Sequence, residues 1–121
     1  QEQLPPAKFV FNDEGRTGKA TDSLVSGGCL ISGSCVTNSV LFSDVHVEDF
    51  CTIQGSVVLP KVTIGRNVIL NNVVIDRGCF IPEGMQIGVD LVEDAKRFHV
   101  SEKGVVLVTP DMLGQDLYRI N

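Results

Sequence analysis

The sequence predicts an all-β protein, a left-handed parallel β-helix with short helical caps. Three observations predict this fold: a period of about 17 residues between positions 45 and 88, apolar residues that come in pairs two positions apart, and an aliphatic composition. The period runs through four separate columns of apolar residues. The columns are Val45, Val62 and Cys79; Val47, Ile64 and Ile81; Cys51, Val68 and Met85; and Ile53, Leu70 and Ile87.

The apolar pairs define short strands. Pairs such as Val62 and Ile64 have the two-residue period of a strand, whereas a helix would space its apolar residues three or four apart. Successive pairs predict three short strands in each coil, and none of these strands can bury a face alone. Coils must therefore stack with their strands parallel. Hexapeptide repeats of this type, with Gly65 and Gly88 at corners, are typical of the left-handed β-helix.

The amino-acid composition fits a β-helix and excludes some classes of binding partner for this protein. Hydrophobic residues make up 43% of the 121 residues and aromatic residues only 6%, which suits the narrow interior of a β-helix. The net charge is −5 and no basic run is present, so nucleic acid and anionic membranes are poor partners. The sequence has no apolar run long enough to span a membrane and no signal peptide at its start, so we expect a soluble, cytoplasmic protein.

The four cysteines, at positions 29, 35, 51 and 79, form no Cys-x-x-Cys motif. Three of them fall at positions that the repeat turns inward. We therefore expect small, buried, reduced thiols rather than a metal site or disulfides, which also fits a cytoplasmic location.

The chain divides into three predicted parts. Residues 1–22 form a leading strand, at 7–11, and a polar loop rich in turn residues. Residues 23–88 form the β-helix coils. Residues 89–121 form a C-terminal cap made of a short helix around 94–98, a strand at 104–109 and a last short helix that begins at Thr109-Pro110. Because the chain begins with Gln rather than Met, we expect it to be part of a longer protein.

The first coil allows two registers that differ by one residue. One matches Ile31 with Ile64; the other keeps steps of seventeen back from Val47 and Ile53. We prefer the first register, although it places a threonine in the core. The preferred register turns inward Cys29, Ile31, Cys35 and Thr37, whereas the alternative turns inward Leu30 and Val36.

Six longer signatures cover residues 5–113. They are P-P-A-K-F, S-L-V-S-G-G-C-x-I-S-G-S, S-V-L-F-S, V-I-D-R-G-C-x-I-P-E-G-M-x-I-G, E-D-A-K-R-F and G-V-V-L-V-T-P-D-M-L. Together they closely resemble the C-terminal domain of bacterial ADP-glucose pyrophosphorylase, also called glucose-1-phosphate adenylyltransferase. Many acyltransferases share hexapeptides alone, but I-D-R-G-x-x-I-P-E-G followed by E-D-A-K-R-F at fixed spacing is far more specific.

The resemblance implies an enzyme that uses ATP, glucose 1-phosphate and Mg²⁺ to make ADP-glucose and pyrophosphate for glycogen synthesis. It places the chemistry in an N-terminal nucleotide-binding domain that these residues do not contain. We therefore predict no catalytic residue, metal ligand or cofactor here, and an inactive protein if this part stands alone. The implied role is to pack against the catalytic domain, to help build a homotetramer, and to bind small anionic effectors such as a sugar phosphate, pyruvate or AMP.

Two places in the sequence are candidate effector sites. Arg77 lies at a coil corner, where its guanidinium could bind a phosphate bidentately, and the resemblance places the arginine of I-D-R in the effector cleft. Ser26, Gly27 and Gly28 could turn consecutive N–H groups toward one anion. Arg77 could instead be a solvated arginine or one paired with an acid. Residues 26–28 could instead form a simple glycine turn. Pro110 stands where some family members carry a basic residue, so fructose 6-phosphate or pyruvate is the better candidate activator than a sugar bisphosphate.

Three alternative functions must be considered. A hexapeptide acyltransferase needs a catalytic histidine near a corner, and a γ-type carbonic anhydrase needs three histidines on zinc. The chain has only His46 and His99, and His46 is predicted to face outward between two inward valines. A purely structural oligomerisation module is the other alternative.

Overall fold

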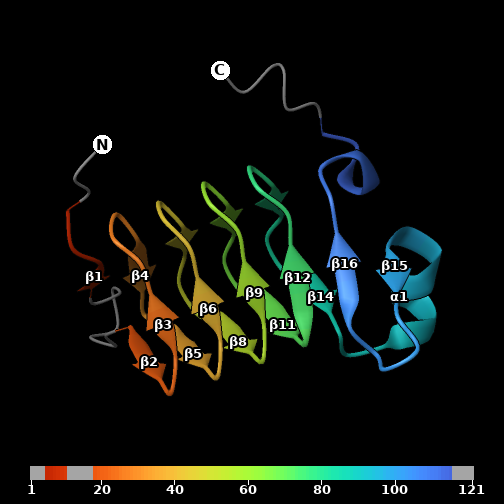
Figure 1. Cartoon of the computed structure of the whole chain (residues 1–121), viewed down its shortest axis with the longest axis horizontal. Coiled ribbons are helices and arrows are strands. Elements are labelled where there is room, and N and C mark those ends of the chain that lie inside the picture. The colour runs from red at the N-terminus through yellow and green to blue at the C-terminus, as the bar shows by residue number, and fades with distance from the viewer. Residues whose placement is uncertain (1–4, 11–17, 116–121) are drawn as a thin grey trace.

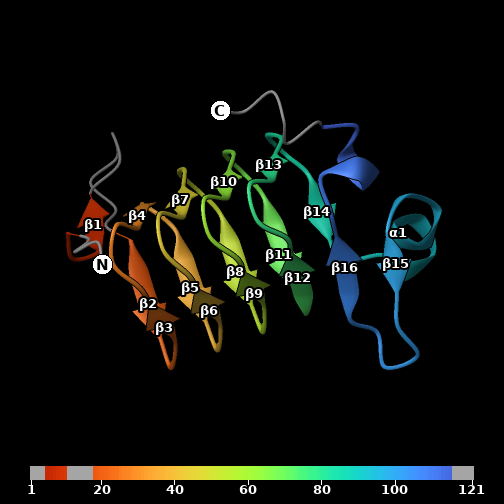
Figure 2. The ribbon, with the colours of Figure 1, turned by 45° about the horizontal axis from the view of Figure 1, so that its top comes forward.

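The computed structural model describes residues 5–10 and 18–115, and their strands form three sheets that wrap one narrow core (Figures 1 and 2). The first sheet contains β1 (Lys8–Val10), β4 (Leu30–Ser32), β7 (His46–Val47), β10 (Thr63–Ile64) and β13 (Phe80–Ile81). The second contains β2 (Lys19–Thr21), β5 (Cys35–Thr37), β8 (Thr52–Gln54), β11 (Ile69–Asn71) and β14 (Gln86–Ile87). The third contains β3 (Leu24–Val25), β6 (Val40–Leu41), β9 (Val57–Val58), β12 (Val73–Ile75), β16 (Val106–Val108) and β15 (His99–Val100).

The coils follow the predicted repeat. Strands of the same sheet pair in parallel with the strand one coil away, so that Ile64 lies beside Val47 on one side and Ile81 on the other. All three side chains are at most 1% exposed. The parallel β-helix with coils of about seventeen residues is therefore confirmed.

The first coil uses both candidate registers, one on each side of a corner. Ile31 pairs with Val47 and is buried, as predicted. Beyond the corner Val36 pairs with Ile53 and is buried, whereas Cys35 is exposed. The prediction that Cys35 and Thr37 face inward is wrong, because the corner between β4 and β5 is one residue shorter than the later ones.

Ser34 takes the place of a cysteine in this shortened coil. It is 3% exposed, and its Oγ accepts the N–H of Cys51 at 2.9 Å, one coil further on. The same hydroxyl donates to backbone carbonyls, including that of Ser32 at 2.9 Å. A polar residue is therefore tolerated in the core column because all its hydrogen bonds are made.

The corners have backbone conformations that favour glycine, asparagine and aspartate. Each coil has a residue with positive φ at each of its three corners. The three rows are Asp22, Asn38, Gly55 and Asn72; Gly28, Asp44, Lys61 and Gly78; and Gly33, Phe50, Asn67 and Gly84. Lys61, at φ 64°, and Phe50, at φ 65°, are the members least suited to this conformation.

Strands near the N-terminus already belong to the sheets. β1 pairs with β4 and β2 pairs with β5, both in parallel. These strands lie within the part, residues 1–22, that the sequence predicted as a leading strand and loop. Position 11 of the predicted strand and positions 12–17 of the predicted loop lie outside the described residues.

The C-terminal part closes the far end of the β-helix (Figure 1). The predicted helix is α1 (Leu91–Arg97), which begins after Asp90, whose carboxylate accepts the N–H groups of Val92 and Glu93. The predicted strand is β16, which adds a further parallel strand beside β12. β15, which the sequence did not predict, pairs with β16 in the antiparallel direction. The last predicted helix is a single 3₁₀ turn, η1 (Asp111–Leu113), which starts after Pro110.

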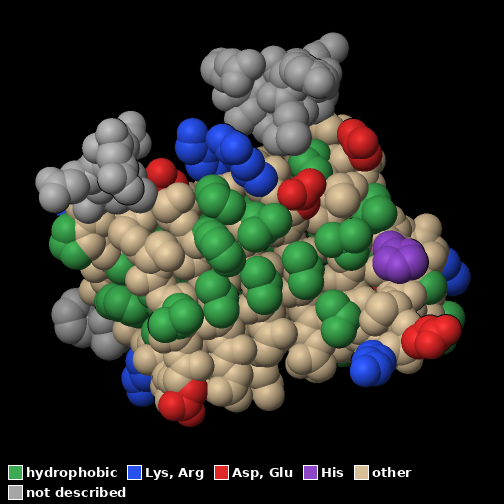
Figure 3. All heavy atoms as spheres, viewed as in Figure 1, with side chains coloured by type: hydrophobic (Ala, Val, Ile, Leu, Met, Phe, Trp, Pro, Cys, Tyr) green, Lys and Arg blue, Asp and Glu red, His purple; other side chains and the backbone are tan. Residues whose placement is uncertain are grey.

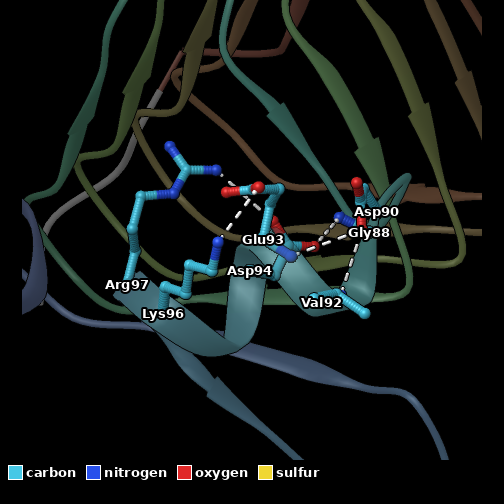
Figure 4. Close-up of polar contacts among 7 residues, drawn as sticks. All are labelled: Gly88, Asp90, Val92, Glu93, Asp94, Lys96 and Arg97. Carbon is cyan, nitrogen blue, oxygen red and sulfur yellow. Dashed lines mark hydrogen bonds and ion pairs between the residues drawn. The ribbon is translucent and has the colours of Figure 1, made fainter.

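A buried carboxylate on α1 accepts a hydrogen bond from the last coil (Figure 4). Asp94 is 1% exposed; its Oδ2 accepts the N–H of Gly88 at 2.7 Å, and its Oδ1 lies 3.4 Å from Nη2 of Arg97. Phe98, 6% exposed, follows the helix and joins the core cluster. The cap is thus held both by apolar burial and by a charged group with its hydrogen bonds made.

Candidate functional site

Both predicted effector segments lie on one edge of the β-helix. Four corners follow successive strands of the third sheet, and we call them the corner row: residues 26–28, 42–44, 59–61 and 76–78. Backbone hydrogen bonds stack them, for example from Asp44 N–H to Gly27 O at 3.3 Å and from Gly78 N–H to Pro60 O at 3.0 Å. Gly27 and Arg77 occupy equivalent places in the first and last of these corners. Three coil steps separate them, which is about 14 Å, so one small ligand cannot contact both.

Arg77 is exposed at the last corner of the row. Its own N–H donates to the carboxylate of Asp76 at 2.8 Å, and among the described residues no ion pair involves its guanidinium. Lys61 stands in the preceding corner and is also exposed. Lys and Arg side chains gather at the upper edge of the view in Figure 3. This end of the corner row therefore presents two neighbouring cations to solvent.

The N–H groups of Ser26, Gly27 and Gly28 do not converge on one point. Ser26 N–H donates to Leu41 O at 2.9 Å, and Gly28 N–H donates to Pro5 O at 2.6 Å. Within the described residues only the Gly27 N–H of the three lacks a backbone acceptor. A carboxylate oxygen of Asp44 also lies so close to Gly28 that a Cβ there would approach it to 2.2 Å. The geometry thus offers at most one donor to an anion, and the site remains a prediction.

A hollow of about 200 Å³ lies beside the first corner of the row. Its lining adds two basic side chains whose closeness to Gly28 was not predicted from the sequence. The lining residues are Pro5, Pro6, Lys8, Gly28, Cys29, Leu30 and His46. His46 is exposed on the outer face, as predicted.

The third sheet carries an apolar outer face. Its outward positions form one register across five strands, and these positions hold only leucine and valine. The face, with two neighbours from the corner row, consists of Leu24, Val40, Val57, Val74, Leu107, Phe42 and Leu59. Leu24 is 70% exposed and Phe42 40%. Figure 3 shows hydrophobic side chains gathered across this face. The corresponding register of the second sheet holds Lys19, Cys35, Thr52, Ile69 and Gln86.

This apolar face was not predicted from the sequence, although a signal was present. The strands of the third sheet are apolar at consecutive positions, as in Val57–Val58 and Val73–Ile75, rather than at alternate ones. Consecutive apolar residues indicate a strand buried on both faces. In the described residues nothing covers the outer face, so it is a candidate contact surface.

The buried cysteines are structural. Burial raises the pKa of the Cys79 thiol to about 12, and burial also raises the pKa of Cys29 and of Cys51. A raised pKa keeps a thiol protonated and unreactive. Among residues 5–10 and 18–115 no three His, Cys, Asp or Glu side chains gather in a way that could hold a metal ion. No helix in that part of the chain is long and apolar enough to cross a membrane.

Comparison with known proteins agrees with this geometry. Residues 5–108 match the model of a protein family described as GlmU-like, C-terminal hexapeptide, and the chain belongs to this family of β-helical domains. Its similarity to curated proteins is more specific, because relatives of high identity are glucose-1-phosphate adenylyltransferases. The chain is 66% identical over 120 residues to that of Methylobacillus flagellatus, 62% over 115 residues to that of Dechloromonas aromatica, and 55% over 120 residues to that of Nitrosospira multiformis.

The alignments cover nearly all of this chain but a minor part of each relative. They include 99%, 95% and 99% of this chain, and 28%, 26% and 28% of the three relatives. The resemblance that the sequence motifs indicated is therefore confirmed, and it concerns the hexapeptide part of those enzymes.

Proposed function

We propose that this chain is the regulatory and assembly domain of a cytoplasmic glucose-1-phosphate adenylyltransferase, which makes ADP-glucose and pyrophosphate from ATP and glucose 1-phosphate. The observation that carries the proposal is the apolar outer face of the third sheet. Relatives named for this activity are more than three times as long as the part they share with this chain. A nucleotide-binding catalytic domain in the remaining length is the occupant that we assign to the face.

The face has the features of an interface between domains. Val57 and Val74 lie at its centre, on neighbouring coils, with no charged residue between them in the register of the strands. Apolar area of this kind is unfavourable in water and favourable in a contact. The β-helix beneath it is stiff because every coil is hydrogen-bonded to the next. It could therefore transmit the differential binding of an effector to a neighbouring active site only through this shared surface.

The experiment uses the intact polypeptide that carries this domain. Val57→Asp should lower thermal stability and ADP-glucose synthesis, because it places a charge in the contact. Thr52→Asp is the matched control, since Thr52 is exposed on the second sheet. Equal behaviour of the two variants would contradict docking on the third sheet. A homotetramer that assembles normally with Val57→Asp but loses activity would separate docking from oligomerisation.

Arg77 and the neighbouring Lys61 support a second element of the proposal, a site for a phosphorylated effector. Synthesis should be assayed with and without fructose 6-phosphate, pyruvate and AMP, for the wild type and for Arg77→Ala. A reduced response to fructose 6-phosphate or AMP, with unchanged basal synthesis, is expected. An unchanged response would make Arg77 an ordinary corner residue. A response to no effector at all would favour the purely structural oligomerisation module, and an absence of ADP-glucose would reopen the acyltransferase alternative.

We assign catalysis to the N-terminal catalytic domain rather than to these residues, and neither Mg²⁺ nor ATP is assigned to them. In this proposal both belong to the catalytic domain.

A further inference from the structure

The first sheet ends at β13, and the outer edge of this strand faces the C-terminal end of the molecule. Among the described strands β13 pairs only with β10. Thr63 N–H of β10 donates to Cys79 O at 3.0 Å. Gly65 N–H donates to Ile81 O at 2.8 Å. Cys79 and Ile81 therefore face β10, and Phe80 between them presents its N–H and C=O groups to the edge of the sheet.

The side-chain amide of Gln115 pairs with both of these groups. Phe80 N–H donates to Oε1 of Gln115 at 2.9 Å, and Nε2 of Gln115 donates to Phe80 O at 2.7 Å. In a further coil, one backbone C=O and one backbone N–H of the next strand would make these two hydrogen bonds. One side chain thus replaces a neighbouring strand at this residue.

The path of the chain brings Gln115 to the place of that strand. β16 lies beside β12, where the third-sheet strand of a further coil would lie. In the coil before, the chain turns at a corner from β12 into β13 of the first sheet. After β16 it forms η1 instead, and Gln115 N–H donates to Pro110 O at 2.8 Å. The backbone therefore begins a further coil, and a side chain completes its contact with the first sheet.

Pro82 removes the next donor along the same edge. In the coil before, the equivalent residue is Gly65, whose N–H donates to the next strand. Pro82 has no N–H, so no donor is left without a partner at this position. Proline occurs in sheets mainly at edges for this reason. The outer edge of β13 thus has no free donor at Phe80 or at Pro82.

An edge strand without such protection can pair with a strand of another molecule. β13 carries no charged residue that would oppose this pairing, and Phe80 is 49% exposed. A second copy of the chain offers a matching strand, because β1 is the strand at the other end of the same sheet. Contacts from the end of one copy to the start of the next do not close and would form chains of molecules.

We propose that Gln115 closes the outer edge of the first sheet and so prevents β13 from pairing with a strand of a second copy. The inference concerns self-association and goes beyond the proposed function. It assigns a role to a side chain in the segment after β16, which the sequence analysis did not connect with the repeat.

The test uses the intact polypeptide that carries this domain. Gln115→Met keeps a side chain of similar length and removes both hydrogen bonds. We expect deuterium exchange of the Phe80 amide, followed by mass spectrometry of short peptides, to become about tenfold faster. We also expect light scattering to show species that are larger than the wild type and grow with protein concentration. Gln54→Met is the matched control, since Gln54 is exposed on β8 in the second sheet.

A second variant separates edge pairing from a loss of folding. Gln115→Met combined with Phe80→Lys lacks the same two hydrogen bonds but places a charge on the edge, so it should keep the size of the wild type. Growth that persists in this double variant, or that also occurs in Gln54→Met, would contradict pairing through β13.

The remaining outcomes are equally decisive. Unchanged exchange at Phe80 in Gln115→Met would overturn the contact. Faster exchange without larger species would overturn the role in preventing self-association. None of these measurements depends on the synthesis of ADP-glucose, so a failure here leaves the proposed function as it stands.

Discussion

Replacing Gly88 with alanine should unfold the end of the β-helix, and Gly84 provides the matched control. Both glycines have positive φ, +86° and +78°, so alanine is strained at either position by about 1–2 kcal/mol. Only Gly88 is also in close contact with backbone: a Cβ there would lie 1.8 Å from the carbonyl oxygen of Asn71 and 2.7 Å from its carbonyl carbon. A Cβ on Gly84 would meet nothing within 4 Å.

The difference between the two variants isolates this contact. Real Cβ contacts are essentially never shorter than 3.0 Å, so the Asn71 carbonyl would have to retreat by roughly an ångström. That movement would disturb β11 and the bond from Gly88 N–H to Asp94, which holds the cap. We expect a loss of about 4 kcal/mol or more for Gly88→Ala, against about 1–2 kcal/mol for Gly84→Ala. Urea unfolding followed by far-ultraviolet circular dichroism measures both, and equal losses would refute the reasoning.

Three further predictions concern the core. Ile64→Ala should cost about 2–5 kcal/mol because the side chain is fully buried, while Thr63→Ala should cost much less; a loss below about 0.5 kcal/mol for Ile64→Ala in urea melts would contradict the column assignment. A thiol reagent at pH 8 should modify one cysteine of the native chain, Cys35, and all four in denaturant. Rapid labelling of Cys79 in the native chain would contradict its burial in the core. The pKa of Cys79 is raised from 9.0 to about 12, so its contribution to stability is complete below pH 9 and is lost as the pH rises toward 12. Cys79→Ala should therefore have a weaker dependence of the urea midpoint on pH in this range, and an unchanged dependence would contradict it.

The repeat predicted most of the fold because its period equals the number of residues in one coil. A residue that recurs after one coil lies beside its equivalent, which is why the columns through Ile64 and Leu70 could be assigned before the structure. The predicted register of the first coil was right before the corner between β4 and β5 and wrong after it, because this corner is one residue shorter than the later ones. A period cannot show on which side of a corner the register changes. Val36 is more apolar than Cys35 or Thr37, and this difference was the available clue.

The candidate site was less accessible to sequence reasoning. The interval of fifty residues between Gly27 and Arg77 is three coils, so their common edge could have been deduced, but the use of the Ser26 and Gly28 N–H groups could not. The hollow depends on β1, which pairs with β4 outside the repeat, at a separation of twenty-two residues. The period of the repeat could therefore not predict that Lys8, Leu30 and His46 line the same hollow.

The shortened corner between Ile31 and Val36 shows how this architecture accommodates changes in chain length. The corner is shorter by one residue where the backbone turns, and the hydroxyl of Ser34 accepts the N–H of Cys51 in the next coil. The strands on both sides keep their partners, so neither of the adjoining sheets slips. Insertions and deletions should thus be admissible at corners and excluded from strands, where a shift by one residue would turn a whole apolar column to solvent. The number of residues in a coil can therefore vary by one, whereas the pairing between strands of neighbouring coils stays the same.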